Sequence, residues 1–237
     1  MKTYQSFWKR LSVLLVAALL TVSFTACSSV GTLVPGDSEG KYVNEKTGKV
    51  YLIAPDCYTV TSYRSDEAVA LNDGVSFYAV DGTENDSWLY SPDFGILLYA
   101  EGETLPTLSE LAPTMMDVRL EDDGIMKTAF EVGSADKISA VLGAYENGNE
   151  LRYMGERANY TFYLEFTSEG YPWLVYNLVF MQFAEEYLTY GKDENGEDTV
   201  IENGKNFLYN RTEDRFVAIG DELQEYIDGY YHNADAE

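Results

Sequence analysis

Histidine and cysteine, which carry much of the nucleophilic, acid–base and zinc chemistry of proteins, are nearly absent from this chain of 237 residues. The single histidine is His232, close to the end of the sequence, and the two cysteines are Cys27 and Cys57. Histidine-based catalytic triads and histidine-rich zinc sites are therefore not expected. We predict that the protein is not an enzyme and has no cofactor, although two of its 40 acidic residues would suffice for glycoside hydrolysis.

Positive charge is also scarce, because 16 lysines and arginines face 40 aspartates and glutamates, for a net charge of −24. Three of the 16 cations and no acid lie in the first 26 residues, so a chain without them has 13 cations and a net charge of −27. Nucleic acid and anionic lipid headgroups bind clustered cations, so neither is an expected partner of the folded part. We expect a cationic protein or a neutral glycan, the alternative being an acidic surface that only keeps the protein soluble.

The sequence has one long apolar run, Leu11–Phe24, which follows the cations Lys2, Lys9 and Arg10. Its 14 residues fall short of the about 20 that a membrane-spanning helix needs. A basic start, a short apolar run and small residues after it are typical of a secretory signal peptide. We therefore interpret residues 1–26 as the signal peptide of an exported protein.

The end of this segment, Phe24-Thr25-Ala26-Cys27, resembles the lipobox of bacterial lipoproteins. The resemblance implies that Cys27 is acylated and becomes the mature N-terminus, so that the bilayer is a partner and the protein faces outward, at the cell surface or in the periplasm. The alternative is a disulfide between Cys27 and Cys57. Residues 27–40 are rich in serine and glycine, and we expect them to be a flexible tether.

Strand patterns dominate residues 41–120, which we predict to be a β-rich part of the folded body. The expected strands are short and separated by glycine and asparagine turns; they cover residues 49–54, 58–63, 75–80, 87–90 and 95–100. Thr107 and Glu110 have the spacing of a capping box, which predicts a short helical turn that ends before Pro113.

Residues 121–237 mix the two patterns and form either a second part or one continuous domain with residues 41–120. Expected strands cover residues 125–132 and 160–166, with a hairpin over 207–219. Apolar residues at helical spacing predict one amphipathic helix after Ser134 and another after Asp221, where Gln224 completes a capping box. Residues 173–183 are apolar on every face, and we predict a central strand, with a buried helix as the alternative. The predicted class is an α+β body, rich in antiparallel sheet, with two or three short helices.

Two weak candidate binding features remain in the sequence. Asp193, Asn195 and Asp198 surround a glycine turn and resemble part of a calcium loop, although their spacing departs from that of an EF-hand. A solvated loop between strands is the alternative. Trp88 is the better candidate of two tryptophans for a sugar-stacking platform, the alternative being a place in the core.

These observations predict a lipid-anchored bacterial lipoprotein that serves as a non-catalytic binding or envelope-interaction module. The alternative function is a glycan-binding or glycan-active surface protein that uses carboxylates and aromatic residues.

Overall fold

The computed structural model describes residues 30–234 except for 85, 149, 152–157, 184–186, 193–194, 197, 204, 212 and 214. Cys27 and the predicted signal peptide lie outside the described residues. The described part is an α+β structure dominated by antiparallel strands, as the sequence predicts. Within it, no helix has the length and apolar character required to cross a membrane.

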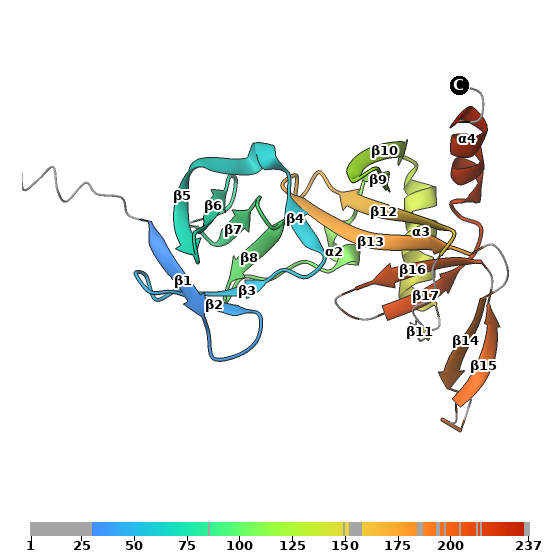
Figure 1. Ribbon diagram of the computed structural model, residues 1–237, viewed down its shortest axis with the longest axis horizontal. Helices are drawn as coiled ribbons and strands as arrows, with labels where there is room; N and C mark the ends of the chain where they lie inside the picture. Colours follow the sequence, from blue (N-terminus) through green and yellow to red (C-terminus); the bar gives the residue numbers. More distant parts are fainter. Residues whose placement is uncertain are drawn as a thin grey trace, which may run out of the picture.

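Seven strands close into a barrel near the N-terminal end of the molecule (Figure 1). Around the barrel they follow the order β1-β2-β3-β8-β7-β6-β5, and a parallel pairing of β1 with β5 closes the ring. Closure leaves no unpaired sheet edge. The strands are β1 (Gly31–Pro35), β2 (Lys41–Asn44), β3 (Val50–Ile53), β5 (Arg64–Asn72), β6 (Val75–Val80), β7 (Trp88–Ser91) and β8 (Ile96–Ala100). The buried barrel interior consists of Leu33, Tyr51, Ala70, Phe77, Leu89 and Leu98.

The barrel corrects the expectation of a tether over residues 27–40, because strand β1 occupies residues 31–35. Leu33 is 1 % exposed and points into the barrel, whereas Thr32 on the opposite face is exposed. Gly31 packs so closely that an added Cβ would lie 2.5 Å from the side chain of Asn44. The serine and glycine content suggested a coil, but the alternation around Leu33 fits a barrel strand.

The second sheet follows the order β10-β9-β12-β13-β16-β17-β11, and β4 joins it by pairing with β13. Its strands are β4 (Cys57–Thr59), β9 (Met115–Asp122), β10 (Ile125–Val132), β11 (Glu150–Leu151), β12 (Tyr160–Thr167), β13 (Leu174–Gln182), β16 (Asn206–Asn210) and β17 (Arg215–Ile219). A separate hairpin contains β14 (Tyr187–Lys192) and β15 (Asp198–Asn203). The helices are the short η1 (Thr61–Tyr63) and α2 (Leu108–Leu111), then α3 (Ala135–Asn147) and α4 (Gln224–Ala234).

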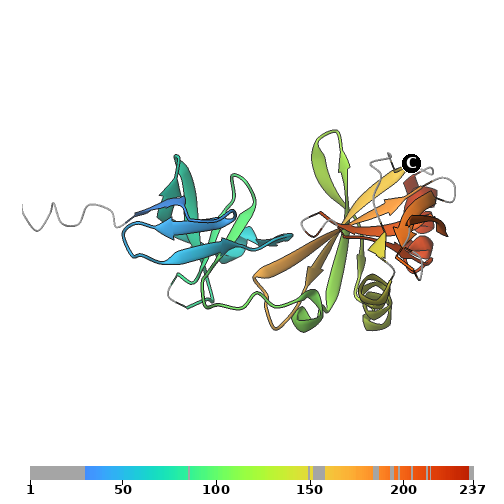
Figure 2. The same cartoon turned by 90° about the horizontal axis from the view of Figure 1, so that it is seen from below.

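One face of the second sheet packs against α3 and α4 (Figure 2). Ile138 and Val141 of α3 and Ile227 of α4 lie in the same buried cluster as Leu178 and Phe180 of β13. The other face of β13 is also buried, through side chains such as Val179 and Met181. The uniformly apolar run is therefore a central strand, as predicted, and it is apolar because both of its faces are covered.

The barrel and the second sheet share one hydrophobic core at their junction. Trp88 on the outside of the barrel contacts Trp173, which immediately precedes β13, with ring centres 4.7 Å apart. Thr59 on β4 donates a 2.6 Å hydrogen bond to the backbone oxygen of Trp173. The expected boundary near residue 120 falls within β9, whereas the last barrel strand ends at Ala100.

The structure treats the two predicted capping boxes differently. Around α2 the box forms, since Thr107 accepts a hydrogen bond from the Glu110 amide and Glu110 caps the Thr107 amide in return. Before α4 the two polar residues attach the helix to the sheet instead. Asp221 accepts a hydrogen bond from Asn206, and Gln224 accepts one from Gln182.

Candidate functional site

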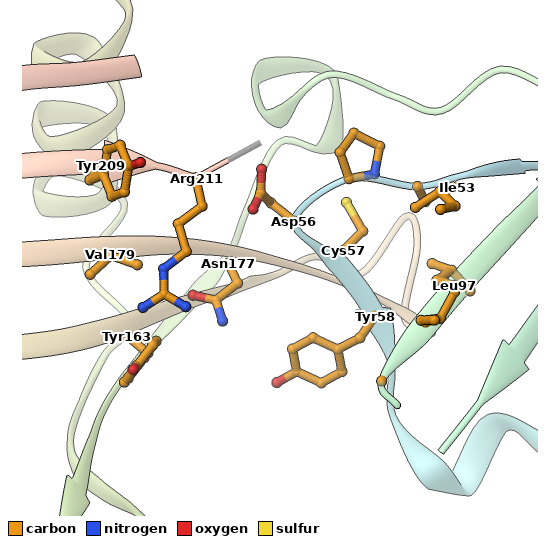
Figure 3. Close-up of a pocket in the computed structure, with 14 residues that line it drawn as sticks. Ile53, Asp56, Cys57, Tyr58, Leu97, Tyr163, Asn177, Val179, Tyr209 and Arg211 are labelled. Atoms are coloured by element: carbon orange, nitrogen blue, oxygen red, sulfur yellow. The ribbon is translucent and has the colours of Figure 1, made fainter. Parts of the chain in front are cut away.

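A cavity of about 330 Å³ opens at the junction of the barrel and the second sheet (Figure 3). The loop between β3 and β4 and the start of β8 form its barrel side. Strands β12, β13 and β16 form its sheet side. Its size is at the small end of the range for ligand pockets, which is about 300 to 1,000 Å³. The polar and aromatic lining includes Asp56, Tyr58, Tyr163, Asn177, Tyr209 and Arg211.

Pairing between β4 and β13 brings Asp56 and Asn177 to the same place in the cavity. The backbone N–H of Asn177 donates a 2.8 Å hydrogen bond to the backbone oxygen of Asp56. Asp56 has a φ of 52°, in the left-handed region that aspartate tolerates better than most residues. Such backbone conformations cluster at functional sites, where surrounding structure holds them in place.

Asn177, which lines the cavity, also has a buried acceptor atom. Its Oδ1 atom is shielded from solvent and has no hydrogen-bond partner among the described residues. Leaving a buried polar atom unpaired costs about 1 to 3 kcal/mol. Asn177 therefore carries an unsatisfied acceptor in the wall of the cavity, out of reach of solvent.

The sheet side of the cavity, next to Asn177, is aromatic and carries the cation of the site. The Arg211 side chain extends along this wall between Tyr209 and Tyr163 (Figure 3). Its guanidinium carbon lies 5.7 Å from the centre of the Tyr163 ring, within reach of a cation–π contact. Arg211 is exposed, so its charge stays in contact with solvent at the cavity mouth.

A row of polar side chains continues from the cavity across the same face of the sheet. Glu165 on β12 lies directly opposite Asn177 on one side and Asp117 on the other. Arg119 donates two hydrogen bonds to Glu165, at 2.8 and 3.1 Å. The Tyr58 phenol also hydrogen-bonds to Glu165, and burial followed by this carboxylate raises the pKa of Tyr58. This network holds Tyr58 at the cavity edge.

Asp117 is the half-buried carboxylate of this row on β9. Burial raises its pKa above the usual value, and the nearby carboxylates of Glu131 and Glu165 raise it further. The Arg119 guanidinium opposes part of that shift. Its Oδ1 atom is buried and has no hydrogen-bond partner among the residues that the structure describes. The row thus concentrates acceptors and negative charge around one arginine.

Cys57 lines the cavity but is not placed as a nucleophile. It is 6 % exposed, and burial raises the pKa of its thiol far above the usual value, while a hydrogen bond with Tyr176 offsets part of the rise. A reactive cysteine needs a stabilised thiolate and access to solvent. Cys57 therefore acts as a small buried side chain.

A second cavity, of about 450 Å³, shares Pro55 and Asp56 with the first and contains the acids Glu146 and Glu213. Ser109 donates a hydrogen bond to Glu146, and Tyr145 donates one of 3.1 Å to Glu213. Both carboxylates thus connect α2, α3 and the β16–β17 hairpin.

The prediction of a sugar-stacking platform at Trp88 is wrong, because the Trp88 side chain is buried. Trp88 is 4 % exposed and lies against Tyr99, at 5.4 Å between ring centres, as well as against Trp173. A ring covered in this way cannot stack on a sugar. The core position, which was the alternative for Trp88, fits the burial of all four residues of β7.

The calcium-loop candidates lie only partly within the described residues. Asp193 lies outside them, Asn195 is an exposed turn residue, and Asp198 begins β15. Among the described residues, no group of three or more acids, histidines or cysteines is arranged to hold a metal ion. The loop therefore stays a prediction, as does acylation of Cys27.

One motif that sequence reasoning missed is Gly36-Asp37-Ser38-Glu39-Gly40, which matches the GxSxG pattern of serine hydrolases. In the structure it connects the antiparallel strands β1 and β2. A nucleophile elbow requires a turn from a strand into a helix. Ser38 is exposed in this turn, so the motif is a hairpin connection.

No protein-family model, curated protein or solved structure matches this chain. The site is therefore interpreted from its own chemistry. Asp56, Asn177 and Arg211 come from segments far apart in the sequence, and only the pairing of β4 with β13 brings the first two together.

Proposed function

We propose that the protein is a lipid-anchored, outward-facing bacterial lipoprotein that acts as a non-catalytic binding module, with its ligand site in the junction cavity. The observation that carries this proposal is one small cavity that gathers the polar side chains of Asp56, Asn177 and Arg211 among aromatic residues. Such a cavity offers recognition through hydrogen bonds and aromatic surface.

The chemistry of the cavity favours binding over catalysis. The Cys57 thiol is held protonated by burial, and Glu165 is engaged by Arg119 and Tyr58. General acid–base catalysis requires a group that exchanges its proton near the working pH and reaches the substrate. The cavity lining instead combines neutral and charge-balanced side chains.

The proposed anchor rests on the lipobox resemblance. The position at which β1 starts then limits how far the barrel can lie from the bilayer. Only residues 28–30 separate Cys27 from Gly31. Three residues span at most about 10 Å. An acylated Cys27 would therefore hold the barrel close to the bilayer, with the second sheet toward the opposite end of the molecule (Figure 1).

We expect the partner to be neutral or cationic, since the full chain carries a net charge of −24. Binding of hen lysozyme, as a cationic probe, should weaken as ionic strength rises from about 50 to 300 mM, because screening shortens the reach of surface charge. A neutral disaccharide should bind with little salt dependence. Duplex DNA should not bind at either ionic strength, because both molecules are polyanions.

Isothermal titration of the three probes against residues 28–237 at both salt concentrations provides the measurement. Tight DNA binding would contradict the charge argument. Absence of binding to every protein and glycan probe would count against the binding module itself.

A further inference from the structure

We propose that a tyrosine surface around helix α4 binds a basic, arginine-containing segment of a partner protein. This tyrosine surface consists of Tyr226, Tyr230 and Tyr231 on α4 and Tyr160, the first residue of β12. It lies at the end of the molecule away from the barrel (Figure 1). None of the four residues lines the junction cavity, so the surface is a second site that goes beyond the proposed ligand site.

The four tyrosine side chains are neighbours and all of them reach solvent. The ring of Tyr231 lies 4.6 Å from that of Tyr160 and 5.3 Å from that of Tyr230, between ring centres. Tyr226 precedes Tyr230 by one helical turn, so the two are adjacent on the helix. Tyr160 is 42 % exposed, and the other three are half-buried. Tyrosine offers a large, rigid contact area with a polar tip, which suits it to protein interfaces.

The charges around the tyrosine surface are mainly negative. Helix α4 has the exposed acids Glu225 and Asp228 and no lysine or arginine. Two lysines come close from other elements, and each has an acid as partner: Lys137 pairs with Glu225, and Lys127, near Tyr230, pairs with a β9 aspartate. Asp228 has no ion-pair partner among the residues that the structure describes. Its charge is therefore open to a cation from another molecule.

One cation of this chain is already held in the manner proposed for the partner. The Lys137 Nζ atom lies 5.9 Å from the centre of the Tyr226 ring and 3.7 Å from a carboxylate oxygen of Glu225. A tyrosine face and a carboxylate thus contact one ammonium group together.

The same combination recurs about one turn further along α4. Asp228 and Tyr231 are three residues apart, a spacing that makes them neighbours on a helix, and Tyr230 lies beside Tyr231. No cation–π contact to either tyrosine is formed within the described part of the chain. Arginine suits this place better than lysine, because its planar guanidinium stacks on aromatic rings and pairs with carboxylates.

Charge distinguishes a basic segment from the other possible occupants. A second copy of this chain would bring acidic surfaces together, and the full chain has a net charge of −24. A neutral glycan would contact the rings but would not use the charges of Glu225 and Asp228. A basic segment uses both. With Cys27 anchored beside β1, as proposed above, this end of the molecule points away from the bilayer, where a partner can reach it.

Matched pairs of variants separate the tyrosine surface from the acidic surface as a whole. Tyr160→Leu with Tyr230→Leu removes two rings and keeps apolar side chains, and Tyr171→Leu makes the same change at an exposed tyrosine between β12 and β13. Asp228→Asn removes one charge at the surface, and Asp93→Asn removes one at an exposed position between β7 and β8. Circular dichroism verifies that each variant is folded.

NMR titration of ¹⁵N-labelled residues 28–237 with a hexa-arginine peptide, at about 50 mM ionic strength, provides the measurement. Hexalysine gives a probe of equal charge, and a glycine–serine peptide gives a neutral one. We expect the shifted amide signals to concentrate in α4 and at the start of β12, and hexa-arginine to bind more tightly than hexalysine. The double tyrosine variant should weaken hexa-arginine binding by about tenfold. Asp228→Asn should weaken it by about threefold, and both controls should stay within about twofold of the unchanged protein.

Four outcomes would overturn the proposal. The first is no binding of hexa-arginine, and the second is a set of shifted signals spread over the acidic surface, with equal effects of Asp228→Asn and Asp93→Asn. The third is binding that the double tyrosine variant leaves unchanged. The fourth is a dimer in sedimentation that this variant abolishes, which would make a second copy the occupant. Lysozyme binding that persists in the double variant would reject this surface and leave the proposed binding module in place.

Discussion

Trp88→Ala is expected to lower the free energy of unfolding by about 3 to 5 kcal/mol, the range for removing a large aromatic side chain from a packed core. Trp88 is 4 % exposed and its ring contacts both Trp173 and Tyr99. The substitution would leave a cavity between the barrel and the second sheet, where the two share one core. Chemical denaturation followed by circular dichroism measures the loss.

Phe94→Ala is the matched control for this substitution, because Phe94 is 67 % exposed at the turn between β7 and β8. An exposed aromatic side chain contributes little to stability, so we expect a change within about 0.5 kcal/mol. Equal losses in the two variants would contradict the shared core at the junction. A sugar platform at Trp88, by contrast, would have predicted a loss of binding without a loss of stability.

Glu165→Ala is expected to cost about 2 to 3 kcal/mol, because it leaves the Arg119 guanidinium without its carboxylate in a half-buried place. The Glu165 side chain is 10 % exposed and accepts hydrogen bonds from Arg119 at 2.8 and 3.1 Å. The range is below that for a fully buried ion pair, since the Arg119 side chain is 30 % exposed. Urea denaturation provides the measurement.

Two further variants test the origin of that cost. Replacing both residues, Arg119→Met with Glu165→Leu, should recover part of the stability, because the Arg119 charge is removed together with its partner, while Asp117 loses a nearby cation. Glu101→Ala breaks a pair with Lys41 in which the glutamate is 57 % exposed, and should cost less than about 0.5 kcal/mol. A double variant as unstable as Glu165→Ala would show that packing, and not the lone charge, determines the effect.

Local pattern was sufficient to predict much of the secondary structure. Strands β6 and β10 have the predicted bounds, residues 75–80 and 125–132, because turn residues mark their ends. Helix α3 has the predicted apolar face, with Ile138, Val141 and Tyr145 buried. In each case the information lies within a short stretch of the chain.

Features that depend on distant contacts were not predictable in this way. Strand β5 begins with the polar residues Arg64 to Glu67, and only pairing with its neighbours makes them a strand. A strand was expected over residues 58–63, but the observed strand β4 ends at Thr59. The chain then turns, and the backbone N–H of Tyr63 donates a hydrogen bond to the backbone oxygen of Val60. Asn177 had no distinguishing pattern in the sequence, since its place in the cavity lining depends on the pairing of β13 with β4 and β16.

The anchor is the feature on which the proposed location depends most. Several acyl chains on Cys27 would hold the protein on a bilayer, at about 0.8 kcal/mol for each buried CH₂ group. The alternative is a disulfide between Cys27 and Cys57. Replacing Cys27 would remove the disulfide as well as the anchor, so that substitution does not distinguish the two. The N-terminus of the mature protein must therefore be read directly.

Mass spectrometry of the N-terminal peptide, prepared from detergent-extracted membranes of the native bacterium, provides that reading. We expect the mature chain to begin at Cys27 and to carry the mass of its acyl chains. A mature chain that begins after Cys27, with no acyl adduct, would contradict the lipid-anchored protein proposed here.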